Sequence, residues 1–272
     1  MIAPWEANAK SVEMIPTVKP GSVCELNLAH FKRQCFSLPH MKLIPALFAF
    51  VGILPLARAG QPFNDAVYHN GSQRIPGAVF CAYYDKGGEG VAYHDTEAEN
   101  QGSGKLNPAD GSYLNEFRRQ EGIDISYTKQ INDLDSPCNR VVPPLGLLYV
   151  GWNSPGEWFN LTVETEKAGS YIADVLYTAQ RDGAVSISAN DGPAVVMPIV
   201  STFDAAETIP WRQWHHWNVS RDAFTVALKK GTNVLTVRIV SGGNLNLATF
   251  AFRPAGAVRT GPDITTFKTP TP

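Results

Sequence analysis

Residues 150–163 read VGWNSPGEWFNLTV, in which Trp152 and Trp158 flank a Ser-Pro-Gly turn. Both tryptophans cannot lie in one regular strand, because proline lacks a donor for the strand ladder and glycine marks a bend. One ring can therefore face a core while the other stands at its rim as a rigid apolar plate, suited to stacking on a sugar or another planar ligand. The alternative is that both rings belong to the core of a β-sandwich.

The remainder of the chain predicts an all-β domain. Short apolar segments alternate with turns such as Arg181-Asp182-Gly183 and Ser241-Gly242-Gly243, and no segment carries a long apolar repeat of helical period. The predicted strands are 78–84, 122–127, 147–152, 158–163, 170–177, 184–189, 216–219, 224–228, 234–240 and 247–252. This pattern predicts an all-β sandwich or jelly roll with long loop insertions.

Two long segments without periodicity, 91–121 and 128–144, interrupt the strand pattern and are rich in Gly, Asn, Asp and Pro. Loops of this length in a compact domain are often functional. We expect a polar lead-in at 60–74, the folded domain at 75–253 and a disordered tail at 254–272, which ends in Thr-Pro-Thr-Pro.

The N-terminal part of the chain carries a targeting signal. Met41-Lys42 precedes an apolar run, and Ala57-Arg58-Ala59 forms an A-x-A pattern. We therefore expect a signal peptide at 41–59 and an over-extended start, not a domain, at 1–40. The apolar run is too short to span a membrane. The protein is then secreted, periplasmic or displayed on the cell surface; the alternative is an uncleaved signal anchor with a small cytoplasmic tail.

The 213 residues that follow carry 17 basic and 22 acidic side chains, a formal charge of −5. Nothing in this balance indicates a nucleic acid or, once the signal is cleaved, a membrane as partner. Cys24 and Cys35 lie upstream of the signal, which leaves Cys81 and Cys138 as a candidate disulfide in an oxidising compartment. No C-x-x-C spacing exists, which disfavours a thiolate zinc site or a thioredoxin-like redox site.

Several short blocks follow one another along the chain. They are IPG at 75–77, YDKGGEGVAYHDT at 84–96, EGIDI at 121–125, VGW and GEW within 150–158, WRQW at 211–214 and NLNL at 244–247. Together they resemble a family 6 carbohydrate-binding module, over roughly residues 75–252. The resemblance implies a lectin-like β-sandwich of the galactose-binding-domain-like kind, which binds a polysaccharide or oligosaccharide without cleaving it. We expect a monomer, with no room for a catalytic domain beside it.

The resemblance also implies a sugar site on the loops at one end of the sandwich. By position in the blocks, Trp152 and Trp211 correspond to two rings that grip a sugar, and Asn246 corresponds to an amide that hydrogen-bonds its hydroxyls. Pyranose C–H faces pack on aromatic plates, and an amide offers both a donor and an acceptor. Trp158 and Trp214 correspond to buried tryptophans of the family.

One part of the family pattern is broken. Members carry three acidic side chains that help to hold a structural calcium ion, and the matching positions here are Phe80, Ala82 and Ala248. Calcium needs several hard oxygen ligands, which these side chains cannot supply. We therefore expect no calcium at this place, no metal ion and no other cofactor.

Two other functions stay open. A small secreted glycoside hydrolase or lyase would use the long loops and need two carboxylates across a cleft, for which Glu157, Asp124, Glu121 and Asp95 are candidates by residue type. An adhesive surface module would instead contact protein through the insertions.

The histidines offer a further candidate constellation. His215-His216 and His94-Asp95 contain common metal and acid–base residues. Adjacent residues on a strand point to opposite faces, so we expect one of His215 and His216 to face outward and one to be packed, without a shared ion.

Overall fold

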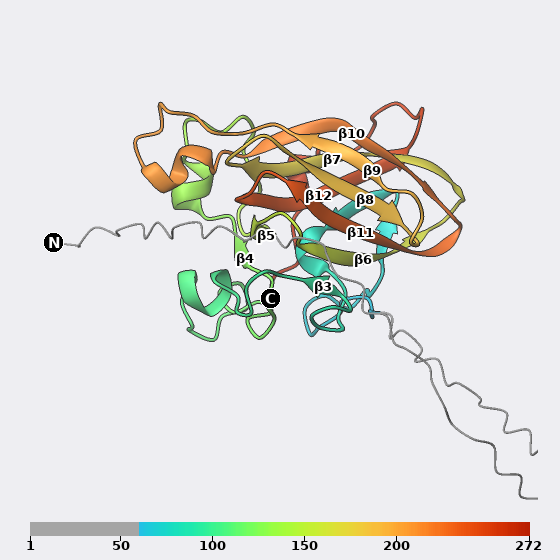
Figure 1. The fold of residues 1–272 in the computed structure, drawn as a ribbon, viewed down its shortest axis with the longest axis horizontal. Coiled ribbons are helices and arrows are strands. Elements are labelled where there is room, and N and C mark those ends of the chain that lie inside the picture. Colours follow the sequence, from blue (N-terminus) through green and yellow to red (C-terminus); the bar gives the residue numbers. More distant parts are fainter. Residues whose placement is uncertain (1–59) are drawn as a thin grey trace, which may run out of the picture. The chain divides into compact units, whose positions relative to one another are not determined.

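The computed structural model describes residues 60–272, and the predicted start at 1–40 and signal peptide at 41–59 lie outside the described residues. Within 60–272 the chain forms two packed β-sheets with a few short helical turns (Figure 1). The prediction of an all-β sandwich is confirmed. No helix in this part of the chain combines the length and the hydropathy that crossing a bilayer requires.

The first sheet has the strand order β1-β6-β11-β8-β9, with β3 paired to β6. Its strands are β1 (Gln73–Ile75), β3 (Tyr93–His94), β6 (Trp158–Thr165), β8 (Gly183–Ala189), β9 (Val195–Ile199) and β11 (Gly231–Ser241). Strand β9 was absent from the sequence prediction, because Pro198 interrupts its apolar run. Proline is tolerated there since β9 is an edge strand, paired only with β8.

The second sheet has the order β10-β7-β12-β5-β4, with β2 paired to β12. Its strands are β2 (Gly77–Phe80), β4 (Ile125–Tyr127), β5 (Leu148–Asn153), β7 (Gly169–Ala179), β10 (Asn218–Leu228) and β12 (Leu245–Pro254). The strands predicted separately at 216–219 and 224–228 are one strand, β10, whose register against β7 shifts between Ser220 and Phe224. The first predicted strand ends at Phe80, where the 3₁₀ turn η1 (Cys81–Tyr83) begins.

The main core fills the space between the sheets. On β6, Phe159, Leu161 and Val163 are fully buried, while Trp158 on the opposite face is only half-buried beneath the Arg238 guanidinium. The expectation that Trp158 is a core residue is therefore wrong. Because side chains alternate along a strand, the burial of Phe159 turns Trp158 outward.

A second apolar cluster covers the outer face of the second sheet. It contains Leu147, Tyr149, Leu176, Trp217, Ala248 and Ile264. On β5, Leu148 and Val150 face the main core while Tyr149 faces this second cluster. The central strands of this sheet are thus buried on both faces, which explains why β5 and β12 are nearly continuous in apolar residues.

The C-terminal tail packs on the sandwich, so its predicted disorder is wrong. Ile264, in the 3₁₀ turn η5 (Ile264–Thr266), is 1% exposed within the second cluster. Thr269 Oγ1 lies 3.2 Å from both the Leu148 amide and the Gly146 carbonyl. The Thr/Pro composition predicts disorder, but composition does not show that one isoleucine, Ile264, becomes buried and anchors the tail.

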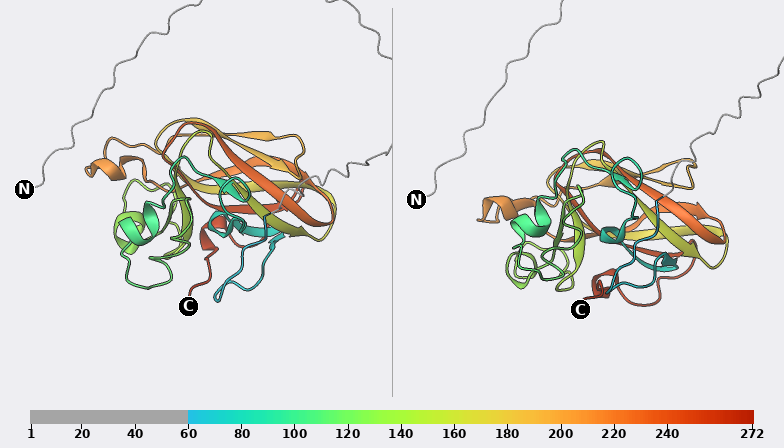
Figure 2. Two further views of the ribbon diagram at one scale, coloured as in Figure 1. Left: turned by 60° about the horizontal axis from the view of Figure 1, so that its bottom comes forward. Right: turned by 90° about the horizontal axis from the view of Figure 1, so that it is seen from below.

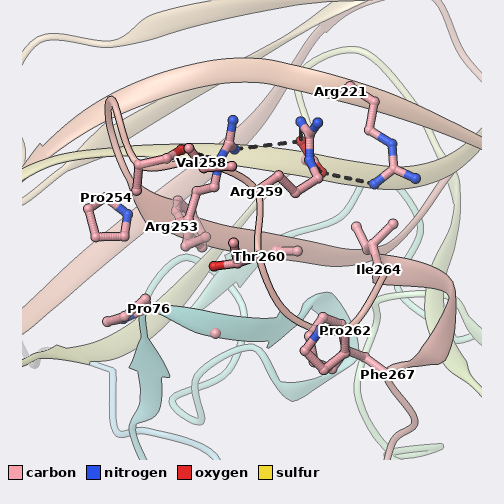
Figure 3. A pocket seen from close by; sticks show the side chains of 15 residues that line it. Pro76, Arg221, Arg253, Pro254, Val258, Arg259, Thr260, Pro262, Ile264 and Phe267 are labelled. Carbon is pink, nitrogen blue, oxygen red and sulfur yellow. Dashed lines mark hydrogen bonds and ion pairs between the residues drawn. The ribbon is translucent and has the colours of Figure 1, made fainter.

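Buried Asp174 on β7 anchors the same tail electrostatically. The Arg259 Nε and Nη2 atoms each lie 2.9 Å from its carboxylate oxygens, and Arg221 also reaches it (Figure 3). Burial opposes ionisation of Asp174, but hydrogen bonds from Arg259, the Asp222 amide and Arg221 outweigh it and lower the pKa of Asp174.

Cys81 and Cys138 are both free thiols, which contradicts the candidate disulfide. Cys81, the first residue of η1, is fully buried in the main core. Cys138 lies in the second insertion beside Glu207 and His216. The two cysteines thus have different neighbours. Spacing along the chain carries no information about these neighbours.

The two insertions and the turn η4 (Pro210–Trp214) gather at the same end of the sandwich (Figures 1 and 2). Apart from the two-residue strand β3, the insertions contain the short turns η2 (Gly102–Leu106) and η3 (Gln130–Leu134), each with non-helical dihedrals inside it. Their predicted irregularity is confirmed. This end of the sandwich carries the cavity described next.

Candidate functional site

Trp152 is presented by a bulge between β5 and β12. Leu245 pairs with Asn153 and Leu247 pairs with Val150, so the register shifts across Gly151 and Trp152. Trp152 adopts a φ of 51°, in the left-handed region that a bulky side chain rarely occupies. Such a conformation costs on the order of 1–3 kcal/mol and persists only where neighbouring groups hold it. A bulge re-aims a side chain, here out of the sheet toward the loops.

The Trp152 backbone is held by Asn246, the residue of β12 that lies opposite the bulge. The Trp152 amide donates to Asn246 Oδ1 over 2.9 Å. Asn246 Nδ2 in turn donates to Thr178 Oγ1 at 2.8 Å and to His215 Nδ1 at 2.9 Å. Asn246 has no exposed surface.

The expectation that Asn246 faces a sugar is therefore not met. Its amide lies beneath the site with both ends engaged, and its neighbour Asn244 lies on the wall of the cavity instead. Asn244 precedes β12, whereas Asn246 lies opposite the bulge of β5, and the sequence does not reveal that bulge.

Trp152 and Trp211 line one cavity of about 480 Å³, which confirms that the fold brings these two residues together. Trp214, His215 and Tyr149 add aromatic surface, and the polar lining comes from Ser126, Lys129, Asn132, Asp133 and Asn244. Trp211, in η4, is 53% exposed, whereas Trp214 is 8% exposed as predicted. The site is thus an aromatic hollow with a polar rim, open to solvent at Trp211.

His215 is the centre of this aromatic surface. Its ring centroid lies 5.6–6.3 Å from those of Tyr149, Trp211, Trp214 and Trp217. Because Nδ1 accepts from Asn246, Nε2 carries the proton and donates to Asp133 Oδ1 at 2.6 Å. One hydrogen-bonded chain therefore links the strained Trp152 backbone to the second insertion.

Asp133 anchors the second insertion to the aromatic centre. Its Oδ1 also accepts from Trp217 Nε1 at 3.3 Å, and its Oδ2 accepts from the Lys129 amide at 2.8 Å. The Lys129 ammonium lies 2.9 Å from Asn107 Oδ1 and above the Tyr127 ring. Burial lowers the pKa of Lys129, and the charge of Asp133 opposes that shift.

A second hollow of about 390 Å³ lies on the other side of Trp152 and shares Leu106, Trp152 and Asn244 with the first. It is acidic, with Asp95, Glu97, Asp124 and Glu157 in its lining. Burial, with repulsion from Glu157 and Asp124, raises the pKa of Asp95 to about 7. Burial, with repulsion from Glu97 and Glu157, raises the pKa of Asp124 to about 6.

Of the carboxylates proposed for catalysis, three thus converge and one does not. Glu121 lies outside the acidic hollow and is paired with Arg118 at 2.7 Å. Glu157 is 6% exposed and already accepts from the Ser154 amide at 2.7 Å and from Thr96 Oγ1 at 2.5 Å. Glu157 therefore supports the loop around Trp152 and has little capacity left for a ligand.

Both members of the His215-His216 pair are buried, so the expectation that one faces outward is wrong. They leave the 3₁₀ turn η4 before β10 begins at Asn218, so the alternation rule for strands does not apply to them. His94 lies elsewhere, with its Nδ1 2.5 Å from Glu89.

The positions expected to lack calcium ligands lie among apolar groups. Ala82 is fully buried in the main core, Ala248 is fully buried in the second cluster, and Phe80 packs against both. Three apolar side chains offer no oxygen ligands there.

Several cavity residues were missed from the sequence. Lys129, Asn132, Asp133 and Leu106 come from the two insertions, and His215 comes from the turn after Trp214. The length and irregularity of the insertions marked them as functional segments, but no pattern indicated which of their residues face the aromatic rings.

No protein-family model matches the chain, and no curated protein matches it. Solved structures with a similar fold include carbohydrate-binding modules. One, from Cellvibrio mixtus lichenase 5A in complex with cellotriose, has a TM-score of 0.32 and 20% identity over 40% of this chain and 79% of that one. Another, from Clostridium stercorarium in complex with cellobiose, has a TM-score of 0.41 and 9% identity over 68% and 99%. A family 35 module from Clostridium thermocellum has a TM-score of 0.31 and 21% identity over 43% and 84%. At such values the function must be argued from this chain's own residues.

Proposed function

We propose that this chain is a secreted, non-catalytic module that binds a polysaccharide or oligosaccharide in the cavity between Trp152 and Trp211. The observation that carries the proposal is that two tryptophans 59 positions apart line one open cavity with a polar rim. The Trp211 side chain is 53% exposed, so its indole ring does not serve as core packing. An exposed indole beside a hollow is a binding surface for a ligand with an apolar face.

The chemistry of the lining suits a sugar. Pyranose rings present C–H faces that pack on indole rings, and their hydroxyls need both donors and acceptors. The lining supplies an ammonium at Lys129 and carboxamides at Asn132 and Asn244. We further propose family 6 as the kind of module, on the sequence blocks that surround Trp152, Trp211 and residues 244–247.

Affinity for one short oligosaccharide should be modest. Aromatic stacking contributes about 0.5–1.5 kcal/mol per ring beyond burial, and hydroxyl hydrogen bonds replace bonds to water. Tight attachment to a polysaccharide then depends on repeated sugars or clustered modules.

The experiment that tests this function is a glycan array followed by calorimetric titration of the best ligand. We expect Trp211→Ala to weaken binding by roughly tenfold or more, with little change in melting temperature because the ring is half exposed. Trp158→Ala is the matched control, since Trp158 is a half-buried tryptophan outside the cavity. Equal affinity of wild type and Trp211→Ala, or an array without any glycan signal, would exclude this site.

A second candidate function is glycoside hydrolysis in the acidic hollow. The observation that favours it is the pKa of about 7 for Asp95 next to other carboxyl groups, a property that a general acid needs. Incubation with the ligands found on the array would then release new reducing ends, and Asp95→Asn would abolish that release. Binding without any new reducing ends supports the non-catalytic function.

A further inference from the structure

We infer that Cys138, Glu207 and His216 form a binding site for a zinc ion beneath the turn that carries Trp211. The thiol sulfur, a carboxylate oxygen and an imidazole nitrogen of these residues all lie within 4.8 Å of one another. Sulfur, nitrogen and oxygen donors in one cluster suit Zn²⁺ and not Ca²⁺, which takes oxygen ligands. This site departs from the expectation, based on the sequence, that the chain binds no metal.

His216 is oriented as a metal-binding histidine is. Its Nδ1 donates to the Thr202 carbonyl at 2.9 Å, which fixes the proton on that nitrogen and leaves a lone pair on Nε2. Nε2 has no hydrogen-bond partner, although the residue is fully buried. A buried imidazole nitrogen without a partner costs free energy unless a ligand occupies it. A backbone carbonyl that orients the second ring nitrogen is the usual companion of a zinc-bound histidine.

The unpartnered nitrogen faces Glu207. His216 Nε2 lies 3.9 Å from Glu207 Oε2, compared with about 3.3 Å between two ligand atoms of a tetrahedral zinc ion. Small side-chain rotations therefore close the site around an ion. With three protein ligands, the fourth position remains for water.

The charges around the site favour a cation. Glu207 Oε2 accepts from Arg212 Nε at 2.7 Å, but Arg212 is shared with Asp135 at 3.2 Å, and Asp204 lies beside Cys138. One guanidinium thus pairs with two carboxylates, and Asp204 adds a third carboxylate beside the thiol. Burial together with Asp204 and Glu207 raises the pKa of the Cys138 thiol. Zinc binding would displace the thiol proton to solvent and form the thiolate bond.

The position of the site explains what the ion would do. Cys138 belongs to the second insertion, and Glu207 and His216 flank η4, the turn that presents Trp211 and Trp214. Neither segment is held by a strand ladder. An ion between them would therefore fix the loop that forms one wall of the cavity, as a structural zinc stabilises other small irregular segments.

The test is zinc binding by the full chain after removal of metal with a chelator. We expect one Zn²⁺ per chain by elemental analysis and a rise in melting temperature on the order of 5 °C at a hundredfold excess over the dissociation constant. Ca²⁺ should give no shift. Co²⁺ as a probe should give a thiolate-to-cobalt charge-transfer band in the near ultraviolet.

Cys138→Ser is the informative variant, because it replaces a half-exposed thiol by an isosteric hydroxyl and should leave the metal-free melting temperature unchanged. It should lose the cobalt band and most of the zinc shift, and His216→Gln should lose the shift as well. Cys81→Ser, which removes the other thiol of residues 60–272, is the control and should keep both signals. An unchanged zinc shift in Cys138→Ser, or less than stoichiometric zinc in wild type, would overturn the assignment. Neither readout depends on sugar binding.

Discussion

Asn246 shows how a buried amide can determine a binding surface that it does not touch. Its side chain contacts the Trp152 amide, Thr178 and His215, and so connects the strained strand β5 to the aromatic centre. The sequence block around it correctly marked this segment as part of the site. It assigned the contact to Asn246 and not to Asn244, because the sequence does not show that Asn246 lies opposite a bulge of β5 while Asn244 precedes β12.

Asn246→Ala should destabilise the fold and weaken sugar binding together. The variant leaves the Trp152 amide and two other buried groups without partners, at about 1–3 kcal/mol for each unsatisfied group. Chemical denaturation and calorimetric titration measure the two effects. Asn244→Gly, which tolerates the φ of 45° at that position, should weaken binding with little loss of stability. The opposite result for the pair would place the ligand contact at Asn246.

Asp95 gives the protein a specific dependence on pH. Its pKa of about 7 in the folded chain exceeds the ordinary value of 3.8, so the folded state binds the proton more tightly than the unfolded state does. The contribution of Asp95 to stability is therefore fully present below pH 3.8 and is lost as the pH rises to about 7.

Asp95→Asn should accordingly raise the free energy of unfolding relative to wild type at pH 8 and not at pH 4, measured by denaturant titration. The exposed Asp191 provides the control substitution, Asp191→Asn, which should give the same difference at both pH values. Parallel pH profiles for wild type and Asp95→Asn would show that Asp95 has no raised pKa.

Among the elements, the strands were predictable and the segments that cover them were not. Alternation or apolar runs marked β5, β6, β7, β8, β11 and β12 to within a few residues. The tail was misjudged because its anchoring depends on few residues. A tail of Thr, Pro and Gly becomes ordered when the sheet beneath it offers an apolar patch, and that patch exists only after folding.

Truncating Ile264, which anchors the tail, should therefore lower the stability of the fold strongly, although η5 is only three residues long. Ile264→Ala should lower the free energy of unfolding by about 2–5 kcal/mol, because a fully buried side chain is truncated in a packed cluster. Val258→Ala, in the same tail but 80% exposed, should change it by less than about 0.5 kcal/mol. Thermal or denaturant unfolding compares the two. Equal, small losses would mean that the tail contributes nothing to stability.

Across the molecule, the site is assembled from segments far apart in the sequence: the first insertion, the second insertion, strand β5, the turn η4 and Asn244, which precedes β12. The sequence could name the two tryptophans, because motifs of a few residues persist around them. It could not name Lys129, Asp133 or His215, since their convergence results from the packing of irregular loops on the second apolar cluster. Local patterns do not encode contacts between such loops.

The burial of the central strands on both faces has a consequence for how this molecule can change over evolutionary time. On β12, substitution meets packing constraints from the main core on one side and from the second cluster on the other. The cavity walls, by contrast, come in part from insertions whose backbones pair with no strand at Leu106, Lys129 and Asn132. New ligand preferences can therefore arise by exchange of loop residues while the strand that supports Trp152 stays the same.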